Sequence, residues 1–265
     1  MERIIVGVDG SAASRAALRW AAAIGRPLDA EVIVVNAWTP VPSELKPSYL
    51  ERLTAERFDW LSGWCEPELT EVKHRFAVPV GDPRNALPEA VEAEEADLLV
   101  IASTGSSGAE PGFLHLGSVA EMLVHHTTIP LAVLPPGCEA PGTRALLATD
   151  GSDQAGAAAR WLASVAPATG HTVLAVTVVD DADAADLDEW TAPLAEAGLA
   201  VEPRVITGGP PAVGILDDVA DRDADLVVMG MRGTGTITGM RLGSVATRVL
   251  RRAEVPVVLI PDPAS

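Results

Sequence analysis

Residues 4–11 read Ile4-Ile5-Val6-Gly7-Val8-Asp9-Gly10-Ser11, and residues 145–152 repeat the pattern as Ala145-Leu146-Leu147-Ala148-Thr149-Asp150-Gly151-Ser152. Further along, Asp97-Leu98-Leu99-Val100 recurs as Asp225-Leu226-Val227-Val228, and Gly117-Ser118-Val119-Ala120 recurs as Gly243-Ser244-Val245-Ala246. The spacing is 141 positions from Asp9 to Asp150, 128 from Asp97 to Asp225 and 126 from Gly117 to Gly243. Because the spacing falls only in two steps, the chain is an internal duplication with two deletions in its second half.

Short apolar runs bounded by turn residues predict five buried strands in each half, with helical patterns between them. The predicted strands lie near 3–8, 31–37, 72–78, 97–102 and 130–134, and near 144–149, 172–179, 201–206, 225–230 and 256–260. Strands joined by helical crossovers form parallel sheets. The predicted fold class is therefore α/β, with two tandem doubly wound five-stranded parallel-sheet domains of strand order 3-2-1-4-5. We place the domains at 1–139 and 140–265, joined by a Pro- and Gly-rich linker, and expect two separate sheets packed as a pseudo-dimer within the chain.

The composition supports buried parallel strands and excludes some partners. Hydrophobic residues make up 48% of the chain and aromatic ones only 4%, which suits strands buried on both faces under Ala-rich helices. The net charge of −18 repels nucleic acid and anionic lipid. No apolar run approaches the ~20 residues that span a bilayer, and the N-terminus shows no signal-peptide pattern. We therefore expect a cytoplasmic protein without nucleic-acid or membrane partners.

The second half carries a candidate anion site. In a sheet of order 3-2-1-4-5, ligands bind beyond the carboxyl ends of strands one and four. Asp150 ends the first strand, Gly230 and Gly233 follow the fourth, and Gly243-Ser244 opens the next helix. We expect the loop glycines to let backbone N–H groups turn inward, and the helix start to offer free N–H groups to an anion. Taken alone, the Gly-x2-Gly pair is also consistent with a plain turn, and the aspartate with a turn or helix-capping role.

The spacing Gly230-x2-Gly233-x9-Gly243-Ser244 resembles the ATP-binding signature of the universal stress protein family. The Val-Asp-Gly-Ser start and the closing Val255-Pro256-Val257-Val258-Leu259-Ile260-Pro261 are similar to that family too. The resemblance covers both halves, in the tandem arrangement common among actinobacterial members. It implies an ATP ligand, with or without Mg²⁺, and a stress-response regulator with at most slow hydrolysis. It also implies dimerisation through the fifth strands, so we expect a homodimer and a protein partner that the sequence does not identify.

The resemblance assigns residues to the two ends of the ligand. It places Asp150 and the backbone of Val178 near the adenosine. It places around the phosphates Met229, Gly230, Arg232, Gly233, Gly243, Ser244 and Val245. The counterparts in the first half are Asp9, Ala37, Gly105, Gly117, Ser118 and Val119.

The first half departs from the signature. Ala102 stands where the second half has Gly230, and Thr104 stands where it has Arg232. Eleven residues separate Gly105 from Gly117 instead of nine, and they include Glu110 but no Lys or Arg. We therefore predict that the first half binds nucleotide more weakly than the second, or not at all.

Three functions stay open on the sequence alone: a nucleotide-binding regulator, a slow ATPase or related enzyme, and an interaction module that needs no nucleotide. The chain has no Gly-x4-Gly-Lys-Ser/Thr loop and no paired general acid and base by spacing, so we predict no catalytic residues.

Cys65 and Cys138 have no metal-ligand spacing, and we predict no metal site. Trp60 and Trp64 lie one helical turn apart and share a helix face, which we expect to be buried against the sheet; the alternative is a partner-binding patch.

Overall fold

Strands and helices alternate along the whole chain. The computed structural model describes residues 1–40, 46–105, 116–138, 142–180, 185–234 and 241–262. The first half contains β1 (Arg3–Gly7), α1 (Ala12–Leu28), β2 (Glu31–Val35), α2 (Pro47–Cys65), the 3-10 helix η1 (Glu66–Glu68), β3 (His74–Ala77), α3 (Pro83–Ala93), β4 (Leu98–Ala102), α4 (Ser118–His126) and β5 (Leu131–Leu134). The second half contains β6 (Arg144–Ala148), α5 (Asp153–Thr169), β7 (Thr172–Val179), α6 (Leu187–Trp190), α7 (Ala192–Glu196), β8 (Val201–Thr207), α8 (Pro211–Asp221), β9 (Leu226–Gly230), α9 (Ser244–Leu250) and β10 (Val257–Ile260).

The predicted fold class is confirmed within each half. The first half has the strand order β3-β2-β1-β4-β5 and the second has β8-β7-β6-β9-β10, which is 3-2-1-4-5 in both. All pairs inside a half are parallel. The domain limits at 139 and 140 fall outside the described residues and stay a prediction.

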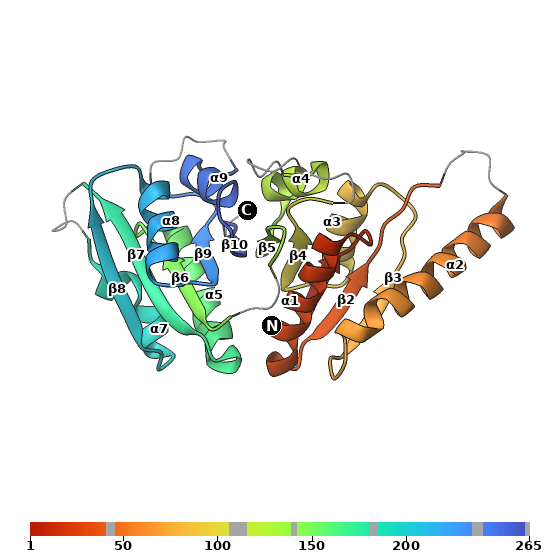
Figure 1. Cartoon of the computed structure of the whole chain (residues 1–265), viewed down its shortest axis with the longest axis horizontal. Helices are drawn as coiled ribbons and strands as arrows, with labels where there is room; N and C mark the ends of the chain where they lie inside the picture. The colour runs from red at the N-terminus through yellow and green to blue at the C-terminus, as the bar shows by residue number, and fades with distance from the viewer. Residues whose placement is uncertain (41–45, 106–115, 139–141, 181–184, 235–240, 263–265) are drawn as a thin grey trace.

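The expectation of two separate sheets is wrong. Strands β5 and β10 pair with each other in antiparallel fashion, so one ten-stranded sheet runs through both halves (Figure 1). Val133 is opposite Val257, and Leu131 is opposite Leu259. Both strands are buried along their full length, and each would otherwise present an unpaired row of backbone N–H and C=O groups. Pairing satisfies these groups, which is the physical reason that the two halves share a sheet.

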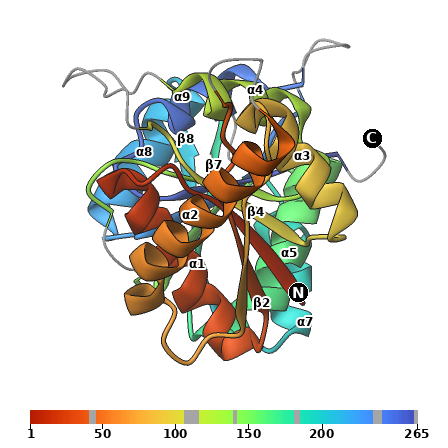
Figure 2. The same cartoon turned by 90° about the vertical axis from the view of Figure 1, so that its right-hand side faces the viewer.

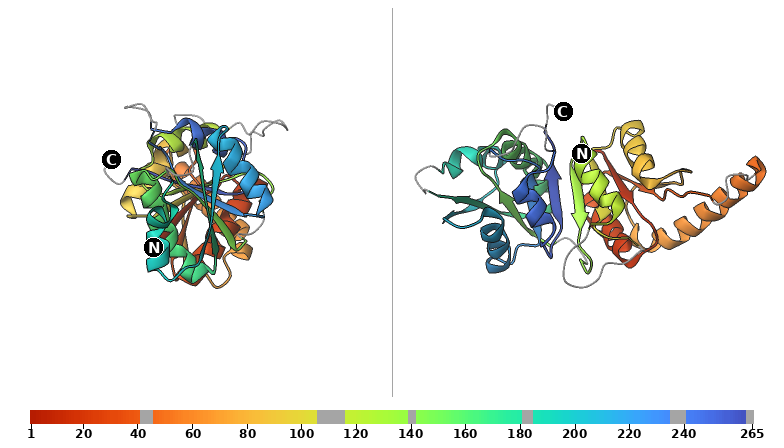
Figure 3. Two further views of the ribbon diagram at one scale, coloured as in Figure 1. Left: turned by 90° about the vertical axis from the view of Figure 1, so that its left-hand side faces the viewer. Right: turned by 90° about the horizontal axis from the view of Figure 1, so that it is seen from above.

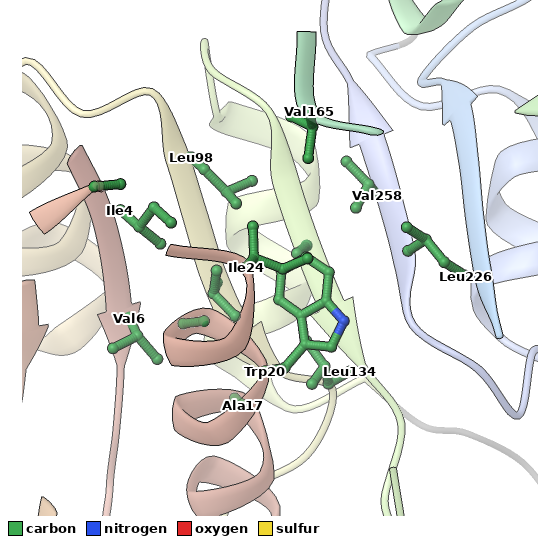
Figure 4. Packing of buried hydrophobic residues seen from close by; sticks show 14 of the residues in the cluster. Ile4, Val6, Ala17, Trp20, Ile24, Leu98, Leu134, Val165, Leu226 and Val258 are labelled. Atoms are coloured by element: carbon green, nitrogen blue, oxygen red, sulfur yellow. The ribbon is translucent and has the colours of Figure 1, made fainter. Parts of the chain in front are cut away.

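Helices cover both faces of this sheet and enclose two buried clusters. One face is covered by α1, α2, α5 and α7, and the other by α3, α4, α8 and α9, as the end-on views show (Figure 2 and the left panel of Figure 3). The cluster under α1 and α5 is continuous across the junction of the halves. Figure 4 shows Ile4 and Trp20 from the first half in the same cluster as Leu226 and Val258 from the second. The halves are therefore joined by side-chain packing as well as by strand pairing.

Helix α2 is the largest difference between the halves. It extends outward beyond β3 at one end of the molecule (Figure 1), and only Leu61 and Cys65 of its residues are buried. Trp60 is 43% exposed and stacks on Trp64 with ring centroids 6.1 Å apart. The prediction that Trp60 lies on a buried face is therefore wrong: its ring lies beside Gly10, in the turn after β1, and stays partly open to solvent. None of the described helices is long and apolar enough to cross a bilayer.

Candidate functional site

A pocket of about 430 Å³ lies in the second half, where β6 and β9 end. Its volume falls in the range of small-molecule sites, about 300–1,000 Å³. All nine second-half residues that the sequence singled out line this pocket: Asp150, Val178, Met229, Gly230, Arg232, Gly233, Gly243, Ser244 and Val245. The fold therefore brings them together, and their roles in binding stay predictions.

Asp150 joins the end of β6 to the glycine loop, which starts at Gly230 at the end of β9 and contains Gly233. One carboxylate oxygen, Oδ1, accepts a hydrogen bond from the amide of Ser152 at 3.1 Å, closing the turn before α5. The other, Oδ2, accepts from the amide of Thr234 at 2.8 Å. The helix cap is Ser152, whose hydroxyl accepts from the amide of Ala155. Asp150 is thus a turn residue that also fixes the loop, and its carboxylate is engaged with backbone N–H groups on both sides.

The two loop glycines are required for space rather than for backbone conformation. Neither Gly230 nor Gly233 has a positive φ, so the backbone conformation alone does not require glycine at either position. A Cβ at Gly233 would overlap the Asp150 carboxylate. A Cβ at Gly230 would lie 2.9 Å from Cβ of Gln154, so this glycine lets β9 approach the first turn of α5 closely.

The start of α9 forms the opposite wall of the pocket. Gly243 caps this helix and offers no side-chain hydrogen bond to its first turn. Its amide donates to the carbonyl of Met231 at 2.7 Å, which ties the helix start to the glycine loop. Ser244, Val245 and Ala246 follow and line the pocket. Uncapped first-turn N–H groups and a hydroxyl are suited to an anion.

Arg232 is the one cationic residue among the described residues that line the pocket. Its amide donates to Oε1 of Gln154 at 2.6 Å, and its guanidinium pairs with Asp262, which follows β10. Arg241, which the sequence places with Arg232 as the two cationic residues nearest to Gly233 and Gly243, is exposed and does not line the pocket. The sequence identified Arg232 and missed both of its partners.

The first half has a smaller pocket at the equivalent place. Its volume is about 280 Å³, between the ends of β1 and β4. The predicted first-half residues all line it: Asp9, Ala37, Gly105, Gly117, Ser118 and Val119. A Cβ at Gly105 would lie 2.6 Å from Oδ2 of Asp9, and the amide of Gly117 donates to the carbonyl of Ser103 at 2.7 Å. The backbone plan of the second-half pocket is therefore repeated, whereas Glu110 and the rest of 106–115 lie outside the described residues.

Sequence reasoning missed three residues of the second-half site: Gln154, Thr234 and Asp262. The signal that could have found them is a difference between the repeats. By the spacings of 141 and 126, Ala13 stands in place of Gln154 and Pro136 in place of Asp262. Positions at which the two repeats have different residues thus indicate side chains that hold the glycine loop in the second half. Among the described residues, no three His, Cys, Asp or Glu side chains gather into a group that could hold a metal ion.

Comparison with known proteins agrees with this geometry. The sequence profile of the universal stress protein family matches residues 1–135 and 183–261. The chain belongs to this family. A universal stress protein of Mycobacterium tuberculosis is 29% identical over 296 residues, covering 97% of this chain and 96% of its own. One of Mycolicibacterium smegmatis is 27% identical over 289 residues, covering 97% and 96%.

A solved structure shares the tandem architecture. The crystal structure of a universal stress protein from Archaeoglobus fulgidus superposes with a TM-score of 0.79 and covers 98% of each chain. Its sequence is 24% identical, so this likeness shows the fold alone.

Proposed function

We propose that this chain is an ATP-binding regulatory protein of the stress response, with the nucleotide held in the second-half pocket. The observation that supports this most strongly is the arrangement of the glycine loop. Asp150 fixes it from one side, and the uncapped start of α9 faces it across the pocket. Such a main-chain cradle binds phosphates through N–H groups and the helix dipole.

The lining of the pocket also suits the two ends of an adenine nucleotide. Apolar side chains of Val178, Pro211 and Ile215 form one part of it, which suits a purine ring and ribose. Gly233, Ser244 and Arg232 form another part, where phosphates would find donors. A Mg²⁺ ion would arrive on the phosphates of the nucleotide. The proposal includes a protein partner and a homodimer. The homodimer would need a surface other than the fifth strands, because β5 and β10 already pair with each other within one chain.

The test is the variant Gly233→Val in the full chain. Its branched side chain would collide with the Asp150 carboxylate and shift the loop, so we expect ATP affinity in the second half to fall at least about 100-fold, or about 2.8 kcal/mol. Isothermal titration calorimetry measures the affinity, and phosphate release measured alongside separates a binder from an ATPase.

The matched control is Gly63→Val in α2, where an added Cβ has no neighbour within 4 Å. This control should bind ATP like the parent chain. An unchanged ATP affinity in Gly233→Val would show that the nucleotide site lies elsewhere.

A further inference from the structure

The cation of the second-half pocket is already paired with a carboxylate. Nη2 of Arg232 lies 2.5 Å from Oδ2 of Asp262, and the two side chains are 30% and 31% exposed. The backbone of Arg232 is held separately by Gln154. The guanidinium can therefore change partner by side-chain rotation while the loop stays in place.

This ion pair belongs to the second half alone. Thr104 stands in place of Arg232 by the spacing of 128, and Pro136 stands in place of Asp262 by the spacing of 126. The first half forms the same sheet order and the same type of pocket without either partner. The repeated fold does not require the ion pair. Its role therefore concerns the ligand that the second-half pocket binds.

We propose that Asp262 competes with the phosphates of a bound ligand for Arg232, so that this pair sets how strongly the second-half pocket favours phosphorylated ligands. The inference rests on the proposed function, because it concerns the same pocket. A phosphate offers several acceptor oxygens, and a planar guanidinium can bind two of them at once. When the guanidinium turns to the ligand, its pair with the Asp262 carboxylate is broken. The free energy of the lost pair is subtracted from the affinity.

The sign of the effect follows from the charges. Removing the charge of Asp262 leaves Arg232 without this competitor and removes a negative charge close to the phosphate end. Both changes raise the affinity for anions, and neither acts on an uncharged nucleoside. A partly exposed ion pair contributes little, so we expect Asp262→Asn to bind ATP and inorganic tripolyphosphate roughly three- to tenfold more tightly than the parent.

The experiment is calorimetry on the full chain with three probes: ATP, adenosine and inorganic tripolyphosphate. Asp262→Asn should leave adenosine affinity within about twofold, and Asp262→Glu, which keeps the charge, should match the parent for all three probes. Glu254→Gln is the matched control, since this exposed carboxylate precedes the other end of β10. In an Arg232→Gln background, Asp262→Asn should give a clearly smaller gain for ATP than in the parent background, because only the removal of the negative charge then remains.

Several results would overturn the inference. They are an ATP or tripolyphosphate affinity in Asp262→Asn that is equal to or weaker than the parent's, an equal gain for adenosine, and a gain that is undiminished without Arg232. Failure of the proposed function gives a different result, in which the parent binds neither ATP nor adenosine. The tripolyphosphate comparison then still decides the inference, because it needs no nucleoside.

Discussion

The two pockets have the same backbone and different side chains. In both, an aspartate at the end of a strand lies against a glycine of the loop, Asp9 at Gly105 and Asp150 at Gly233. In both, the glycine before a helix donates its amide back to the loop. The cavity volumes are about 280 and 430 Å³. The duplicated fold thus specifies the cradle twice, and the residues around the cradle make the two copies unequal.

The differences gather on the loop after the fourth strand. In the second half this loop is held by Gln154 and carries Arg232, which pairs with Asp262. The corresponding residues of the first half are Ala13, Thr104 and Pro136. Thr104 replaces the arginine itself. Ala13 and Pro136, which replace its two partners, have no side-chain acceptor for a hydrogen bond. The comparison teaches that main-chain geometry makes an anion site possible here, while a few side chains set its strength and selectivity.

The largest expected effect concerns stability, at the repeated tryptophans of α1 and α5. Trp20 is 1% exposed, whereas Trp161 at the equivalent position is half-buried. Trp20→Ala should lower the free energy of unfolding by about 3–5 kcal/mol through the cavity that it leaves. Trp161→Ala should cost about 1–2 kcal/mol, because less apolar surface is lost from the core. Urea denaturation followed by circular dichroism measures both, and equal costs would show that the repeats pack alike.

The second expected effect is the unequal affinity of the two pockets for ATP. A hydrogen bond to a charged group contributes about 1.5–3 kcal/mol, so the pocket without an arginine should bind at least about tenfold more weakly. The full chain is needed, since separated halves would expose β5 and β10. Gly105→Val, whose Cβ would crowd Asp9, should keep the tight phase of a calorimetric titration, and Gly233→Val should keep only the weak one. Equal affinities in the two variants would contradict the asymmetry.

Much of the fold could be predicted from the sequence because its signals are local. Every strand was expected within a few residues of its observed limits, since apolar runs bounded by turn residues are read directly from the chain. The repeat doubled this information. The pocket residues were also brought together as expected, because their place at the carboxyl ends of β6 and β9 follows from the strand order.

The failures concern contacts between distant parts of the chain. The antiparallel pairing of β5 with β10 joins strands 126 residues apart, and an apolar run does not reveal its partner. Trp60 was expected to be buried, but helical periodicity does not show that its ring lies beside a surface turn at Gly10 rather than in the core. The packing role of Gly230 was not predicted, because the side chain that approaches it belongs to Gln154, which lies 76 positions earlier in the chain.

The smallest expected effect tests whether Gln154 matters to the asymmetry. Its side chain is 7% exposed and accepts the hydrogen bond of the Arg232 amide. Gln154→Met keeps the length of the side chain and removes the acceptor, so an amide beside the pocket loses its partner. We expect a loss of about 1 kcal/mol in stability and a two- to fivefold weaker ATP affinity in the second half. Gln154→Glu keeps an acceptor at the same place and should restore most of the stability, which a purely steric role would not require, whereas its added negative charge should keep ATP affinity below the parent's. Thermal unfolding and calorimetry on the two variants measure these changes.

If Gln154→Met binds ATP as the parent does, Asp150 alone holds the loop well enough for binding. The difference between Gln154 and Ala13 then does not contribute to the unequal affinities of the two pockets.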